Sequence, residues 1–220
     1  MGELTGGAGV LLAVAAVAAV VNWVGVWRDD QRLVYGAKPA TLALLIGAAL
    51  ALHPDDGTVR AWFVAGLVLS LAGDVFLMLP EDTSTPLPPF LLGLGSFLLG
   101  HVAYIAGLAG DHRSWTATGA GVVLVLGALA VIAPRVLAGV RERDSALRGP
   151  VLAYMAVISV MVVAAFGRTV AAGVVGALLF YASDATLAWN RFFGPRRSWR
   201  LAVMVTYHLG QAGLVLSLVG

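Results

Sequence analysis

Two aspartates stand inside long apolar stretches of this 220-residue chain. Asp74 lies in LSLAGDVFLML and Asp184 lies in FYASDATLAW, where most neighbours are aliphatic or aromatic. A charge at the centre of a membrane helix costs about 2.5 to 3.5 kcal/mol, so each carboxylate needs a reason. Two carboxyl groups in one poorly solvated site do not both ionise easily, so one can stay protonated while the other is an anion. Such a pair can perform acid–base chemistry, and it can also bind a cation or shuttle protons.

The composition indicates what surrounds these aspartates. Hydrophobic residues make up 60% of the chain and charged residues 12%, and the mean hydropathy is +0.90, whereas a soluble domain has about 45 to 50% apolar residues. A helix needs about 20 mostly apolar residues to cross a bilayer. The sequence therefore predicts an all-α, polytopic membrane helical bundle of eight transmembrane helices, forming one domain over residues 1–220. The apolar runs cover residues 7–27, 38–53, 61–79, 90–109, 115–133, 150–167, 170–190 and 200–219.

The basic residues predict the orientation, because Lys and Arg are retained on the cytoplasmic side. All of the 14 Lys and Arg residues except Arg60, Arg113 and Arg168 fall in the first, third, fifth and seventh connections. We therefore expect both termini outside the cell, in a multi-pass protein of the plasma membrane. The third connection carries Glu81 and Asp82 without a basic residue and lends this orientation no support. The pI of 9.3 follows from the same flanking residues, so no nucleic-acid partner is expected.

Several kinds of chemistry are excluded or disfavoured. The chain has no cysteine, which rules out disulfides, thiol nucleophiles and cysteine metal sites. An Asp and His site for zinc remains conceivable, but the residues lack a recognised spacing such as HExxH. We therefore expect no metal and no cofactor. The first apolar run is longer than the core of a signal peptide, so we expect it to remain as a helix.

Both aspartates are predicted at one depth, about 10 Å from the cytoplasmic ends of their helices at about 1.5 Å per residue. Other polar residues reach that depth or go deeper, and residues three or four apart share a helix face. Six helices therefore offer polar groups to one predicted cavity that opens toward the cytoplasm. Besides Asp74 and Asp184, the candidate residues are Asn22, Lys38, His101, Tyr104, Tyr181, Arg191, Tyr207, His208 and Gln211.

Structural interpretations compete with this one. An intramembrane aspartate can cap a broken helix or pair with Lys38, and a buried His or Tyr can hold helices together. Lys38 and Arg191 lie near the headgroup zone, where basic side chains commonly snorkel. The third and fourth helices resemble the seventh and eighth, since Asp74 precedes His101 as Asp184 precedes His208. This plan suits a weak parallel repeat of four helices each.

Motifs along nearly the whole chain resemble those of the lysoplasmalogenase family, also called YhhN-like. They are KP at 38–39, GDVFLM at 73–78, F..GLGSFLLGH..Y at 90–104, GALLFYASDATLAWNRF at 176–192 and TYHLGQ at 206–211. The resemblance implies a multi-pass membrane enzyme that hydrolyses the vinyl ether bond of lysoplasmalogens to a fatty aldehyde and a glycerophospho-alcohol. By position it adds Asn190 to the polar core, whereas His208 stands where an aromatic residue is expected in many relatives.

Vinyl ether hydrolysis needs one acid and one anion, which fits Asp74 and Asp184 as the catalytic residues. Tyr181 and Ser183 flank Asp184 as hydrogen-bond donors, which favours Asp184 as the anion and Asp74 as the acid. The expected partners are membrane lipid and a lysophospholipid substrate whose phosphate lies near Lys38 or Arg191. The alternatives are a proton- or cation-coupled small-molecule transporter that uses the same aspartates, and a lipid-binding protein without turnover.

Overall fold

The computed structural model describes residues 2, 4–54, 56–80 and 87–220. In these ranges eight helices are long and apolar enough to cross a membrane, which confirms the predicted all-α fold. Glu81 and Asp82, on which the expectation for the third connection depends, lie outside the described residues. The helices are α1 (Gly6–Arg28), α2 (Gln31–Ala51), α3 (Gly57–Met78), α4 (Pro89–Gly110), α5 (Trp115–Arg143), α6 (Arg148–Arg168), α7 (Ala171–Phe193) and α8 (Arg197–Leu216), with 3-10 turns η1 (Ser145–Leu147) and η2 (Ser217–Val219).

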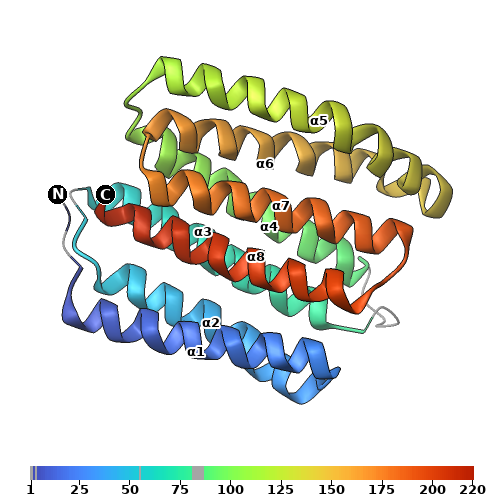
Figure 1. Cartoon of the computed structure of the whole chain (residues 1–220), viewed down its shortest axis with the longest axis horizontal. Coiled ribbons are helices and arrows are strands. Elements are labelled where there is room, and N and C mark those ends of the chain that lie inside the picture. The colour runs from blue at the N-terminus through green and yellow to red at the C-terminus, as the bar shows by residue number, and fades with distance from the viewer. Residues whose placement is uncertain (1, 3, 55, 81–86) are drawn as a thin grey trace.

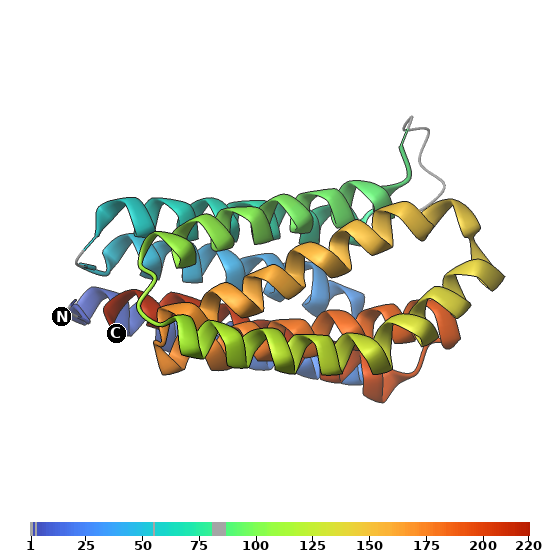
Figure 2. The ribbon, with the colours of Figure 1, turned by 90° about the horizontal axis from the view of Figure 1, so that it is seen from above.

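The helices form two layers. One layer contains α2, α3 and α4, the other contains α1, α8, α7 and α5 in that order, and α6 crosses obliquely between them (Figures 1 and 2). The two termini lie at the same end of the bundle (Figure 1). Which end faces the cytoplasm stays a prediction. The buried polar side chains lie where the two layers meet, so residues far apart in sequence come together there.

Two helices extend well beyond their predicted ends. α2 begins at Gln31 because the side chain of Asp30 accepts hydrogen bonds from the backbone of Arg32 and Leu33, which caps the helix before the apolar run starts. Lys38, expected at the interface where the helix opens, is therefore inside α2 and 6% exposed. α5 continues through Pro134 to Arg143, although Pro134 and Arg135 interrupt its apolar run. Hydropathy detects an uninterrupted apolar run and misses the parts of a helix that lie beyond such residues.

The contact between α7 and α8 brings their backbones together. A Cβ added to Gly176 of α7 would lie 2.7 Å from the backbone nitrogen of Leu214 and 2.8 Å from the carbonyl oxygen of Gly210, both on α8. Only glycine permits so close an approach, which is typical of packing between membrane helices. The helix that carries Asp184 is thus fixed directly against the helix that carries Tyr207.

Gly176→Ala is expected to destabilise the protein by about 1 to 3 kcal/mol, because the added methyl group overpacks against backbone that cannot move aside. The matched control is Gly127→Ala on α5, where an added Cβ meets nothing within 4 Å. Unfolding in mixed detergent micelles should show a loss for the first variant and none for the second. An equal loss in both would show that the close backbone contact is unimportant.

An ion-pair network holds the end of the bundle where the termini lie. Arg168, which is 4% exposed, donates hydrogen bonds to Asp111 at 3.0 Å and to Ser217 at 3.1 Å. Arg113 also pairs with Asp111, at 2.7 Å. Burial alone would raise the pKa of Asp111, but the hydrogen bonds from Arg113 and Arg168 outweigh burial and hold that pKa below its usual range. This network joins α6 to the connection after α4 and to the C-terminal turn.

Candidate active site

Asp74 of α3 contacts polar side chains from two other helices, α2 and α8. It lies on α3, is 1% exposed, and forms an ion pair with Lys38 of α2, whose Nζ is 2.9 Å from Oδ1. The hydroxyl of Tyr207 on α8 donates to Oδ2 of the same carboxyl group at 2.8 Å. An ammonium group and a hydroxyl donor both stabilise a carboxylate. This geometry favours Asp74 as an anion.

Asp184 has different partners. The hydroxyl of Tyr154 on α6 donates to Oδ2 at 2.5 Å, and Nε2 of His101 on α4 lies 3.8 Å from that oxygen. His101 approaches the carbonyl of Phe97 through Nδ1 at 2.7 Å, so Nδ1 carries the proton in the neutral ring and Nε2 carries a lone pair. A lone pair repels a carboxylate but not a carboxylic acid, and 3.8 Å is too long for a hydrogen-bonded ion pair. The surroundings of Asp184 therefore favour its protonated form.

Aromatic rings connect the surroundings of the two carboxyl groups. His101, beside Asp184, packs on Phe180 with ring centroids 4.7 Å apart, and Phe180 packs on Tyr207, beside Asp74, at 5.3 Å. Among the described residues, no hydrogen bond or ion pair joins Asp74 to Asp184. The site therefore offers two carboxyl groups with different partners rather than a pair that shares one proton.

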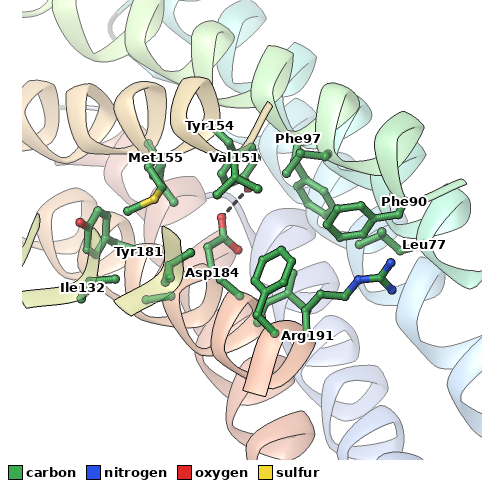
Figure 3. Close-up of a pocket in the computed structure, with 17 residues that line it drawn as sticks. Leu77, Phe90, Phe97, Ile132, Val151, Tyr154, Met155, Tyr181, Asp184 and Arg191 are labelled. Atoms are coloured by element: carbon green, nitrogen blue, oxygen red, sulfur yellow. Dashed lines mark hydrogen bonds between the residues drawn. The ribbon is translucent and has the colours of Figure 1, made fainter. Parts of the chain in front are cut away.

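Asp184 faces an apolar cavity of about 70 Å³ between α3, α4, α5, α6 and α7. In Figure 3 its carboxyl group is directed toward Tyr154, while Arg191, Phe90 and Leu77 lie toward one side. The guanidinium carbon of Arg191 lies 4.4 Å from the ring centroid of Phe90, in cation–π contact. The lining of the cavity thus contains one carboxyl group, one guanidinium and the hydroxyl groups of Tyr154 and Tyr181 among mostly apolar side chains.

A second, polar cavity of about 300 Å³ lies at the end of the bundle opposite the termini. Its lining includes Lys38, Asn190, Arg200 and Asp29. Asp29 accepts hydrogen bonds from Arg200 and from Arg197, and these two bonds, with Arg200 the stronger, lower the pKa of Asp29. The polar cavity therefore carries basic groups near an ionised carboxylate, a setting suited to a charged or zwitterionic group.

Leu77 and Leu187 line both cavities. Leu77 follows Asp74 by three residues on α3, and Leu187 follows Asp184 by three residues on α7, so each leucine shares a helix face with its aspartate. Each carboxyl group therefore lies about one helical turn from the boundary between the cavities, on the same helix face as the leucine. A molecule with a charged head and a hydrocarbon chain would place the junction of its two parts at that boundary.

The predicted site residues divide into those that reach a cavity and those that do not. Tyr181, Asp184 and Arg191 line the apolar cavity, and Lys38 and Asn190 line the polar one. Asn190 also accepts a hydrogen bond from the backbone of Arg196 at 2.9 Å, which shapes the turn between α7 and α8. The other predicted residues line neither of these cavities: Asn22, Asp74, His101, Tyr104, Tyr207, His208 and Gln211.

Four of those residues are buried without contacting either aspartate. Tyr104 donates to Gln211 at 2.5 Å, Trp23 donates to Nδ1 of His208 at 3.0 Å, and Asn22 makes no side-chain hydrogen bond. They join α1, α4 and α8 behind Asp74. Their role in binding a substrate stays a prediction.

The sequence argument for the neighbours of Asp184 was wrong. Ser183 donates to the carbonyl of Val203 on α8 at 3.0 Å, and neither Ser183 nor Tyr181 donates to Asp184. The actual donor, Tyr154, was missed because it belongs to a different helix. It is the only tyrosine of the sixth apolar run, which is the one signal that could have identified it.

A sequence model of the YhhN family matches residues 33–218. A protein named lysoplasmalogenase from Mycobacterium bovis is 34% identical over 161 residues, which are 71% of this chain and 59% of that protein. Lysoplasmalogenase TMEM86B is 30% identical over 190 residues in Sus scrofa, covering 86% and 77%, and 27% identical over 198 residues in Homo sapiens, covering 87% and 79%. The chain thus covers less than two thirds of the mycobacterial protein. No solved structure matches the chain.

Proposed function

Since this chain belongs to the YhhN family, we propose that it hydrolyses the vinyl ether bond of lysoplasmalogen, releasing a fatty aldehyde and a glycerophospho-alcohol. One observation carries the proposal: a polar and an apolar cavity meet at Leu77 and Leu187, each one turn from a buried carboxyl group, and the two carboxyl groups have different partners. The names of the mycobacterial and mammalian relatives support the same reaction.

The substrate lies across the boundary between the cavities. Its phosphate occupies the polar cavity beside Lys38 and Arg200, and its hydrocarbon chain begins in the apolar cavity. The vinyl ether, which joins these two parts, then lies level with Leu77 and Leu187. In the bound complex the ammonium group of Lys38 interacts with both the phosphate and Asp74. It therefore neutralises the negative charge of Asp74 less fully than in the free protein.

Asp184 acts as the general acid. It gives its proton to the alkene carbon farther from the ether oxygen, and the π electrons form the new C–H bond. The other alkene carbon becomes an oxocarbenium ion, which the anion of Asp74 stabilises across the site. Water adds to that carbon and loses a proton to the carboxylate of Asp184, which restores the acid. The hemiacetal then breaks its bond to the glycerol oxygen and leaves an aldehyde and a free hydroxyl group.

The direct test supplies purified protein in vesicles with a lysoplasmalogen and measures released aldehyde. Matched lipids with a saturated ether or an ester at the same position serve as controls. We expect aldehyde from the vinyl ether and no cleavage of the saturated ether. A folded protein that releases no aldehyde would contradict the proposal. Proton flux without lipid, lost in both aspartate variants, would instead support the transporter.

Tyr154→Phe is expected to lower kcat about tenfold with little change in KM, because a hydrogen bond to a charged group is worth about 1.5 to 3 kcal/mol and part of it is regained from water. The bond orients Asp184 and stabilises the carboxylate left after proton transfer. The control is Ser159→Ala, which removes a hydroxyl from the same helix that interacts with Tyr181 rather than with Asp184. Equal losses of kcat in the two variants would contradict the role of Tyr154.

A further inference from the structure

The apolar cavity is too small for a lipid chain. It holds about 70 Å³, whereas clefts that hold small-molecule ligands measure about 300 to 1,000 Å³. Along α7 its lining runs from Arg191 to Tyr181, about 15 Å at about 1.5 Å per residue. Asp184 lies only one turn from the Tyr181 end, so little of the cavity lies beyond it. A long chain whose reacting bond reaches Asp184 must therefore leave through a wall.

The wall formed by α5 packs apart from the main core of the bundle. Its residues belong to a small apolar cluster separate from the main core, whose buried members are Val136, Val140, Leu147, Val151 and Phe192. Three of these line the cavity. After Pro134 the buried residues of α5 are only Val136, Gly139 and Val140, and Figure 1 shows α5 at the outer edge of the bundle. Segments with few buried contacts open at the lowest cost in free energy.

The remaining walls are held more tightly. Gly176 brings α7 into backbone contact with α8. On the opposite side, a Cβ added to Gly100 of α4 would lie 3.2 Å from the carbonyl oxygen of Gly66 on α3. Helices in backbone contact cannot separate without losing many close contacts. The α5 side is the wall that can move.

α5 also contains a proline beside the cavity, where the helix can bend. Pro134 lies inside the helix, between Ile132 and Val136, the two α5 residues that line the cavity. Proline has no N–H and releases the carbonyl four residues earlier, which loosens the helix at that point. Next to it, the guanidinium of Arg135 donates to the carbonyl of Val131 at 2.5 Å. The half of α5 after Pro134 can thus change its angle without moving the first half.

We propose that residues 135–143 of α5 are a movable wall, and that the hydrocarbon chain of a single-chain amphiphile enters and leaves the cavity from the bilayer through the seam between this segment and α7. The seam closes at Gly139, where an added Cβ would lie 2.9 Å from Cβ of Phe192. The identification of the chain as that of a lysolipid depends on the proposed function, whereas the seam itself depends only on the packing.

The absence of cysteine from the chain allows the seam to be locked directly. Gly139→Cys with Phe192→Cys joins α5 to α7 on oxidation, since disulfides need a Cβ separation of about 3.5 to 4.5 Å and the two helices must part only slightly. The matched control is Gly121→Cys with Phe166→Cys, where the added Cβ is also 2.9 Å from the phenylalanine Cβ. That disulfide joins α5 to α6 before Pro134, away from the cavity.

The measured quantity is the association rate of a fluorescent lysolipid with a saturated ether, which binds without being cleaved. Oxidation should slow association at least tenfold in the Gly139 and Phe192 variant, with recovery on reduction, and should leave the control unchanged. Pro134→Ala, which removes the hinge without a disulfide, should slow association several-fold. Normal association in the oxidised seam variant or in Pro134→Ala would overturn the proposal. If locking the seam slows lipid binding but the protein releases no aldehyde from a lysoplasmalogen, the proposed hydrolase function is wrong. The proposed entry route through the seam would still hold.

Discussion

Asp184→Asn is expected to lower kcat/KM for aldehyde release by about 10² to 10⁴-fold, which is the contribution of proton transfer by a positioned acid. Asparagine has the same shape as aspartic acid but no acidic proton. Its carbonyl oxygen can still accept the hydrogen bond that Tyr154 gives to Asp184. Because a neutral acid is replaced by a neutral amide, the free energy of unfolding should change little.

The loss of activity in Asp184→Asn can thus be separated from misfolding by measuring aldehyde release and thermal unfolding on the same preparation. Asp184→Glu keeps the acid but moves it by one methylene, so it should recover part of the activity. An asparagine variant that retains more than a tenth of the original kcat/KM would exclude Asp184 as the acid.

Asp74→Asn is expected to lower both stability and activity. It leaves the ammonium of Lys38, 2.9 Å from Asp74, buried without its partner, and breaking a buried ion pair costs about 3 to 5 kcal/mol. It also removes the anion that stabilises the oxocarbenium ion, a loss of about 10² to 10³-fold by analogy with other electrostatic stabilisers. Unfolding and aldehyde release measure the two effects separately.

The double variant Lys38→Met with Asp74→Asn distinguishes a structural from a catalytic role. It removes both charges, so the free energy of unfolding should return most of the way to that of the original protein. The value of kcat should stay at least about 10²-fold low because the anion is still missing, whereas the loss of Lys38 from the phosphate should appear in KM. Recovery of activity together with stability would show that Asp74 serves only to neutralise Lys38.

The sequence was sufficient for the features that depend on local pattern. Apolar runs long enough to cross a bilayer predicted all eight helices, because the cost of exposing polar groups to lipid acts on every residue of a span. The same cost made Asp74 and Asp184 conspicuous. Polar residues and a proline interrupt this signal, which is why the start of α2 and the part of α5 after Pro134 were missed.

The partners of each aspartate depend on which helices are neighbours, and spacing along one helix does not determine that. Tyr181 and Ser183 lie close to Asp184 in sequence, yet Ser183 bonds to α8 and the donor to Asp184 comes from α6. Likewise, the sequence left the pairing of Lys38 with Asp74 as one of several interpretations. The packing of α2 against α3 brings the two charged groups to 2.9 Å. The proposed reversal of the roles of the two aspartates rests on these contacts between helices.

The boundary at Leu77 and Leu187 also has a consequence for the number of chains on the lipid. A substrate bound across it has hydrocarbon on one side and charge on the other. An intact two-chain plasmalogen carries a second hydrocarbon chain on the adjacent glycerol carbon, and that chain would have to lie among Lys38, Asn190 and Arg200. Displacing hydrated charges with apolar groups is unfavourable. If the proposed function holds, these two leucines and the polar groups beyond them restrict the substrate to lipids with a single hydrocarbon chain.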